Sequence, residues 1–121
     1  MLSAYGNDRT SLRGGFFLQQ LCLQNILHDG REVTPEQVIR EFNRKPDRNR
    51  CKLAIGRFKV ECCLRSLPVH GQQVIPDEVV RDFPDSQEGI LGKARFKAEC
   101  CLRGLVLNGR QVTTDEVVKG F

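Results

Sequence analysis

The chain has 121 residues, 40% of them hydrophobic, with six cysteines and a formal net charge of +4. This composition fits one compact domain, or a piece of a longer array. No stretch is long and apolar enough to span a bilayer, and Met1–Arg13 lacks the apolar run of a secretory signal. We therefore expect no membrane association and read residues 1–11 as a polar leader, compatible with that of a bacterial secreted effector.

One unit is written three times along the chain. Residues 53–83 (unit 2) align without a gap with residues 91–121 (unit 3) and are identical at 18 of 31 positions. A fainter copy, unit 1, covers residues 12–42, and residues 43–52 and 84–90 are connectors. Such a period is typical of stacked arrays in which neighbouring units share a core. We predict an all-α fold, a short right-handed solenoid of three units that each hold a long and a short helix.

The long helix of unit 2 is predicted from about Leu53 to Pro68. Its apolar residues lie on two sides at helical spacing, as in a helix packed between neighbours, and Gly56 is expected to permit close helix approach beside Cys63. A polar ridge lies between the two apolar stripes and recurs in unit 3. Because its members are four residues apart, each glutamate can meet two arginines. The ridge comprises Arg57, Glu61, Arg65, Arg95, Glu99 and Arg103.

A glycine follows each long helix, at Gly30, Gly71 and Gly109. We expect the glycine to end the helix in a left-handed conformation; the alternative is a two-residue turn such as Asn108-Gly109 that closes a small hairpin, against which Pro68 and the short arms argue. The short helix then begins at Thr34 or Thr113, with a capping box. Unit 2 has Ile75 at this position, so its short helix should be the least well started.

The positions of the cysteines predict buried thiols rather than disulfides. Cys22, Cys63 and Cys101 share one repeat position, as expected of a small buried hydrophobe. Cys51 lies in a charged connector and is expected to be the exposed thiol that reacts first. Unpaired cysteines indicate a reducing compartment, the cytoplasm or, for a secreted effector, the host cytosol. The thiols expected to be shielded are Cys22, Cys62, Cys63, Cys100 and Cys101.

Neither a metal site nor catalytic machinery recurs between the units. Zinc needs about four converging ligands, yet His70 beside Cys62 and Cys63 is replaced by Asn108 in unit 3. A cysteine nucleophile would need an oriented base, and the two histidines have no recurring carboxylate partner. The segment 89–93 lacks the first glycine and the Ser/Thr of a phosphate-binding loop. We expect no enzyme and no cofactor.

Two charged regions are candidates for binding a partner. The connector 43–52 carries five cations against Asp47 alone, and five minus one accounts for the whole net charge of +4. The ridge is the second region. We expect another protein as the partner; the alternative is a nucleic-acid-binding repeat module that uses the same residues. The connector lacks aromatic residues for base stacking. Its cations are Arg44, Lys45, Arg48, Arg50 and Lys52.

Residues 27–39, LHDGREVTPEQVI, resemble the junction in repeats of the bacterial transcription-activator-like effectors, where a helix ends at a glycine before Thr-Pro-Glu-Gln-Val. That family reads DNA from a glycine-bearing loop after the short helix. Here this place is filled by connectors of unequal length and unrelated composition. The resemblance implies a helical superhelix rather than DNA readout. More broadly, the chain is similar to tandem helical-repeat proteins of bacterial secreted-effector type, which implies binding of host or bacterial proteins.

The two end units differ in polarity. Unit 1 has Gln19 where unit 2 has Val60, as expected of a terminal unit with a polar outer face. Unit 3 does not show this polarity, since it matches unit 2 at 18 of 31 positions, through to Phe121. We therefore expect either a fragment of a longer array or self-association through an apolar stripe of unit 3. That stripe comprises Ala98, Cys101, Leu102 and Leu105.

Overall fold

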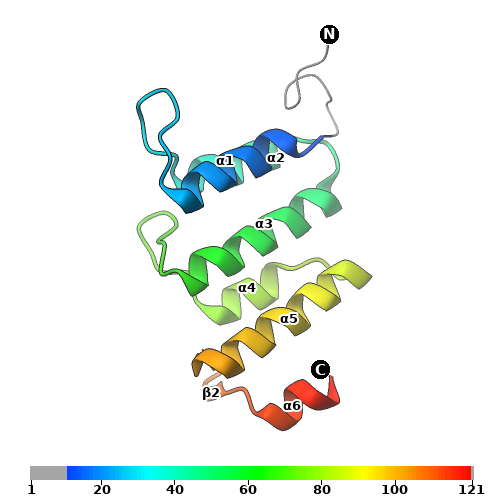
Figure 1. Cartoon of the computed structure of the whole chain (residues 1–121). Helices are drawn as coiled ribbons and strands as arrows, with labels where there is room; N and C mark the ends of the chain where they lie inside the picture. Colours follow the sequence, from blue (N-terminus) through cyan, green and yellow to red (C-terminus); the bar gives the residue numbers. More distant parts are fainter. Residues whose placement is uncertain (1–10, 121) are drawn as a thin grey trace.

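The computed structural model describes residues 11–120, and most of this part of the chain is helical. The prediction of an all-α fold is confirmed, apart from one two-stranded hairpin. Figure 1 shows α1, α3 and α5 following one another down the molecule. The elements are α1 (Arg13–Gln24), α2 (Pro35–Asn43), α3 (Arg48–Leu64), α4 (Pro76–Asp82), α5 (Gln87–Arg103), β1 (Val106–Leu107), β2 (Arg110–Gln111) and α6 (Thr114–Lys119).

The long helices begin earlier than the sequence pattern predicts. The Asp47 side chain accepts a hydrogen bond from the N–H of Arg50 at 3.0 Å and starts α3 inside the connector 43–52. Ser86 does the same for α5, accepting from the N–H of Gly89 at 3.1 Å. The expectation that 43–52 and 84–90 are loops throughout is therefore wrong, because each contains an N-cap and the first turns of a helix.

The long helices also end earlier than predicted, before the glycines. Asn25, Ser66 and Gly104 adopt the left-handed conformation, with φ of 56°, 58° and 67°. In each case the N–H of the next residue bonds a carbonyl five residues back, as Leu67 does with Cys62 at 2.8 Å. This pattern satisfies the last carbonyls of a helix.

Gly30, Gly71 and Gly109 lie instead in hairpin turns. Both central residues of each turn have positive φ, for example 54° at Asn108 and 79° at Gly109. Backbone hydrogen bonds close the turns, between β1 and β2 in unit 3 and between single residue pairs in units 1 and 2. Two positive φ values are what a two-residue hairpin of this type requires. Of the two alternatives, the hairpin is correct and the glycine helix end is wrong.

The short helices begin as predicted. Thr34 and Thr113 form complete capping boxes with Gln37 and Glu116. Ile75 occupies the same place at the start of α4 and provides no side-chain hydrogen bond. The prediction that unit 2 has the least well-started short helix is confirmed in this respect.

Phenylalanines at the ends of α2 and α4 pack against glycines in the long helices. Phe83 lies between α3 and α5, since a Cβ on Gly56 or Gly92 would come within 3.0 Å or 2.5 Å of its ring. Gly56 therefore makes room for Phe83, rather than for the close helix approach expected from the sequence. The buried residues form one continuous cluster, with Phe58 and Phe96 at 0% and 1% exposure.

Hydrogen bonds we call clasps join the hairpin turns of units 2 and 3 to the short helix of the preceding unit. The backbone N–H of His70 donates to the Glu36 carboxylate, and that of Asn108 donates to the Asp77 carboxylate at 2.9 Å. Glu36 and Asp77 both directly follow the proline that begins their helix. The same two elements thus meet in the same way at both junctions.

Candidate protein-interaction surface

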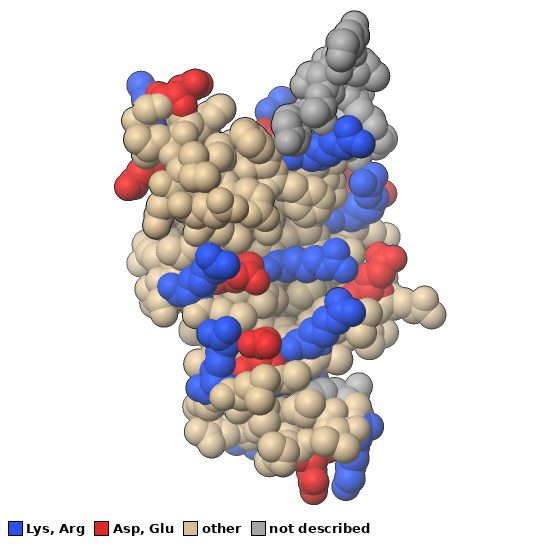
Figure 2. All heavy atoms as spheres, in the orientation of Figure 1, with Lys and Arg blue, Asp and Glu red and all other residues tan. Residues whose placement is uncertain are grey.

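The arginines and glutamates of the ridge lie on α3 and α5, with Arg65 directly after α3, and share one face: four of them line one groove, and the other two pair with its glutamates. Figure 2 shows this face, with blue and red side chains alternating in rows that follow these two helices. Because equivalent positions of the two units face the same way, the rows repeat from α3 to α5. The structure therefore brings the six predicted ridge residues onto one surface.

Each glutamate of the ridge pairs with only one arginine. Arg65 Nε lies 3.0 Å from Glu61 Oε1, and Arg103 Nε lies 3.1 Å from Glu99 Oε1. The expectation that each glutamate meets two arginines is wrong. A carboxylate favours the cation that follows it by four residues, in keeping with the helix dipole. Within residues 11–120, Arg57 and Arg95 have no ion-pair partner and are exposed.

A groove of about 310 Å³ lies between these two arginines. Val60, Phe83 and Phe96 provide apolar surface in it. The sequence predicts these residues only as apolar residues that pack between helices, and no motif indicates that they belong to a binding site. The remaining lining residues are Gln19, Arg57, Glu61, Gly92, Arg95 and Glu99. An apolar hollow flanked by cations suits a segment that carries both an apolar and an acidic side chain.

The structure divides the basic connector into two parts. Arg44 and Lys45 follow α2 and lie 2.9 Å and 3.7 Å from the carboxylate of Glu41. Arg48, Arg50 and Lys52 lie on the first turns of α3 and are exposed. The five cations are therefore not one free patch, since part of their charge is balanced locally.

The cysteines are all unpaired, and burial governs their reactivity. Burial raises the pKa of Cys62 to about 12 and that of Cys100 to about 11. The expectation that Cys51 is the exposed thiol is wrong. Because α3 begins at Arg48, the helix turns Cys51 into the core, where it is 2% exposed and burial raises its pKa. Reactive thiols need the opposite environment.

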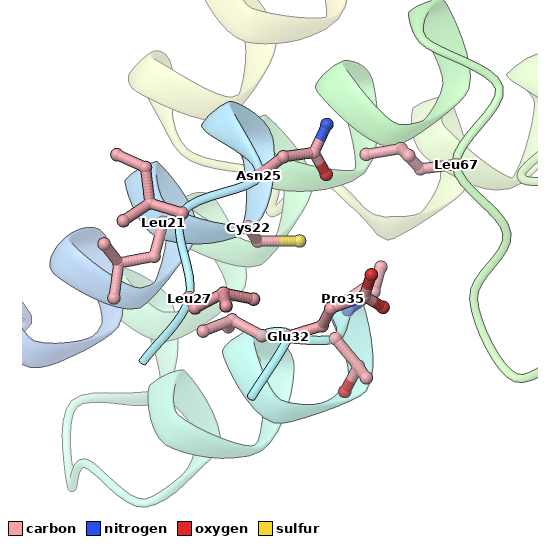
Figure 3. Close-up of a pocket in the computed structure, with 10 residues that line it drawn as sticks. Leu21, Cys22, Asn25, Leu27, Glu32, Pro35 and Leu67 are labelled. Carbon is pink, nitrogen blue, oxygen red and sulfur yellow. The ribbon is translucent and has the colours of Figure 1, made fainter. Parts of the chain in front are cut away.

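A second hollow, of about 230 Å³, lies at the junction of units 1 and 2. Figure 3 shows it, with Leu67 of unit 2 directed toward Asn25 of unit 1 and the Cys22 sulfur turned into the same space. Its lining is largely apolar, and Leu67 is the residue of unit 2 that contributes to it. This hollow therefore belongs to the packing of one unit against the next.

The residues predicted for self-association lie in different surroundings. Leu102 is 80% exposed, whereas Ala98, Cys101 and Leu105 are half-buried. Val118 of α6, which the sequence prediction did not include, is 83% exposed. Val118 holds the repeat position of Val80 in unit 2, which is half-buried. This shared position could have predicted that Val118 belongs to the apolar surface of unit 3.

Within residues 11–120, no group of three or more His, Cys, Asp or Glu side chains is placed to hold a metal ion. No helix in this range combines the length and apolar character needed to cross a membrane. Comparison with protein-family models, curated proteins and solved structures finds no match. A functional assignment therefore depends on the geometry of the chain itself.

Proposed function

We propose that this chain is a non-enzymatic scaffold for protein–protein interaction, built as a short right-handed solenoid of three helical-repeat units. The recurrence of sequence, hairpin turn and clasp at both junctions supports this arrangement. Arrays of this kind present extended surfaces for binding. The resemblance to bacterial effector repeats is in keeping with that role.

The groove between Arg57 and Arg95 carries the proposal. Both guanidinium groups lack an ion-pair partner within residues 11–120, and apolar side chains lie between them. Arginine binds carboxylates in a fixed two-pronged geometry and is enriched at the energetically important centres of interfaces. A partner segment would place a carboxylate on an arginine and an apolar side chain against Phe83 or Phe96.

The charge around the groove selects the sign of the partner. Four arginines of the ridge face two glutamates, and both glutamates already pair with Arg65 or Arg103. The face therefore carries an excess of two positive charges, four minus two. Electrostatic complementarity of this kind favours acidic partners and speeds their association at low salt.

A pull-down with paired charge-reversal variants tests the proposal. Immobilised chain is exposed to nuclease-treated lysate, and retained proteins are compared between wild type and the double variant Arg57→Glu/Arg95→Glu. The control, Arg31→Glu/Arg40→Glu, makes the same change of charge at exposed positions outside the groove. We expect retention that the control keeps and the groove variant loses. Equal retention by wild type and groove variant would rule out this surface.

A second candidate function is nucleic-acid binding through the first turns of α3. It is favoured by the exposure of Arg48, Arg50 and Lys52 in one short segment. Such binding weakens as salt neutralises phosphate contacts. Retention of RNA or DNA that Arg48→Glu/Arg50→Glu abolishes, with Arg57→Glu/Arg95→Glu unaffected, would favour this function over the protein scaffold.

A further inference from the structure

We propose that the two ends of the described fold are complementary, so that a second copy of this chain docks head to tail. Unit 1 of one copy would pack on unit 3 of another, as unit 2 packs on unit 1 within the chain. These surfaces are separate from the groove between Arg57 and Arg95.

Inside the chain, each unit contacts the next through two kinds of interaction. The first is the clasp, in which a turn N–H donates to Glu36 or Asp77. The second is apolar: Leu67 of unit 2 lines the hollow formed by unit 1 residues such as Cys22 and Val33 (Figure 3). A docked unit therefore contributes one backbone donor and one apolar side chain.

In units 1 and 2, the following unit covers the face that carries the clasp carboxylate. In unit 3, no part of residues 11–120 covers this face. Asp115 holds the position of Glu36 and Asp77, yet accepts no hydrogen bond within that range. Leu102 and Val118 are 80% and 83% exposed. The hollow that Leu67 lines in unit 1 corresponds in unit 3 to the positions of Cys100, Cys101, Val112 and Thr114.

Unit 1 has the matching donor and apolar side chain. Asp29 holds the turn position of His70 and Asn108, with the same positive φ of 50°. Its N–H has no acceptor within the described residues. Ile26 holds the position of Leu67 and is 47% exposed. In a docked pair, Ile26 would enter the hollow of unit 3 and the Asp29 N–H would donate to Asp115.

One charge opposes this contact and sets its strength. The inner clasps place a histidine or an asparagine beside the accepting carboxylate, whereas the outer one brings the Asp29 carboxylate, 91% exposed, next to Asp115. Two like charges at an interface weaken it. Association of the wild type is therefore weak, and Asp29→Asn, which copies Asn108, strengthens it. Because the two faces differ, each docked copy leaves one face of each kind open, so that further copies add head to tail beyond a dimer.

Sedimentation velocity over a range of concentrations tests the proposal. We expect the average mass of the wild type to rise at high concentration, and Asp29→Asn to lower the dissociation constant on the order of tenfold. Ile26→Glu and Leu102→Glu should each abolish the increase. Ile90→Glu, at an exposed position on the first turn of α5 that is also exposed at its counterpart Lys52 and lies outside the hollow, should leave it unchanged. Circular dichroism confirms that each variant is folded.

Mixing the two inactive variants distinguishes head-to-tail docking from any symmetric pairing. The Ile26→Glu copy retains an intact unit 3 face, and the Leu102→Glu copy retains an intact unit 1 face. In the Asp29→Asn background, their mixture should form a one-to-one dimer and nothing larger. Strict monomers of both wild type and Asp29→Asn at every concentration would overturn the proposal. So would association that Leu102→Glu abolishes and Ile26→Glu does not, because that pattern indicates pairing of two unit 3 faces.

Discussion

The middle unit and the two end units have similar sequences but different surroundings. Phe58 of unit 2 is fully buried, while Phe17 at the same position of unit 1 is 39% exposed. On the other side, Val79 is fully buried, whereas its counterpart Val117 of unit 3 is only half-buried. Identical or similar residues thus differ in burial because a neighbouring unit covers one and not the other. In this chain, stability is shared between adjacent units rather than contained within each.

The glutamate that units 2 and 3 share at one repeat position also makes different polar contacts in the two units. Glu78 of unit 2 pairs with Lys59 at 3.0 Å. Its counterpart Glu116 accepts a hydrogen bond from Arg110 at 2.8 Å and completes the capping box of Thr113. The hydrogen bond from Arg110 is the main reason that the pKa of Glu116 is lowered to about 2. One residue type therefore serves helix–helix contact in the middle unit and helix capping in the last.

Truncation of the equivalent phenylalanines provides the largest test of this comparison. Phe58→Ala removes a fully buried ring and should lower the free energy of unfolding by about 3–5 kcal/mol. Phe17→Ala should lower it by less than half as much, since part of that ring already meets solvent. Urea denaturation with both variants measures the difference. Equal losses would mean that neighbouring units do not determine burial as described.

The ion pairs of Lys59 provide an intermediate test. Lys59 Nζ lies 3.0 Å from Glu78 and 2.7 Å from Asp82, and its side chain is only 15% exposed. Lys59→Leu leaves two neighbouring carboxylates without their cation and should cost about 1–3 kcal/mol of stability. Adding Glu78→Gln to this variant gives the residues that unit 1 has at the same two positions, Leu18 and Gln37. This second change should restore part of the lost stability. Thermal denaturation of both variants checks this, and an unchanged melting temperature in Lys59→Leu would contradict it.

The pH dependence of this contact has a defined sign. Burial alone lowers the pKa of Lys59, but the hydrogen bonds and charges of Asp82 and Glu78 outweigh it and raise the pKa above the ordinary 10.5. A raised pKa adds stability that is fully present below the unfolded value and is lost as pH rises through the folded value. The stability difference between wild type and Lys59→Leu should therefore shrink above about pH 10.5.

Helix capping distinguishes unit 2 from its neighbours by a smaller amount. Ile75 makes no capping hydrogen bond and is 55% exposed, so Ile75→Thr removes little buried surface. We expect a gain of about 1 kcal/mol in the free energy of unfolding. The reverse change, Thr113→Ile in unit 3, should lose a similar amount. Chemical denaturation of this reciprocal pair measures both, and a loss in Ile75→Thr would show that the turn before α4 cannot accept a cap.

Acid titration tests the clasp between units 1 and 2, with the smallest expected effect. The hydrogen bond from the His70 backbone is the largest cause that lowers the pKa of Glu36 below its ordinary 4.5. A lowered pKa adds stability that is present above the unfolded value and is lost as pH falls through the folded value. Below pH 4.5, wild type should therefore lose more stability than Glu36→Gln. Glu32→Gln, in an exposed loop, is the control and should behave as wild type.

The sequence predicted those features that have a chemical signature within a few residues. Thr34 and Thr113 identify helix starts, and Ile75 identifies the missing cap. The helix end was preferred to the hairpin, wrongly, because an Asp-Gly or Asn-Gly pair satisfies both a left-handed helix end and a two-residue turn. Of the true helix ends, Asn25 and Gly104 are residue types that favour the left-handed conformation and could have indicated them, whereas Ser66 gives no such signal.

The candidate surface was predictable in its charges but not in its shape. The ridge residues follow from spacing, and the preference of glutamate for a later arginine would also have predicted the Glu61–Arg65 pair. The groove depends on how closely α3 and α5 approach around Phe83, which no local pattern specifies. The burial of Cys51 was missed because it depends on where α3 begins. Asp47, the single carboxylate that caps α3, lies among five cations, and the segment was therefore predicted as a charged connector.

The clasps have a consequence for the order in which the chain folds. The side-chain hydrogen bonds between units connect residues only 31, 34 and 42 positions apart. Closing loops of this size involves a modest loss of chain entropy, and proteins built from such near-neighbour contacts fold quickly. We expect a nucleus of any two adjacent units, with the third added by zipping along the chain. Unfolding would then begin at an end unit, so that amide hydrogens of α3 exchange more slowly than those of α1 or α6.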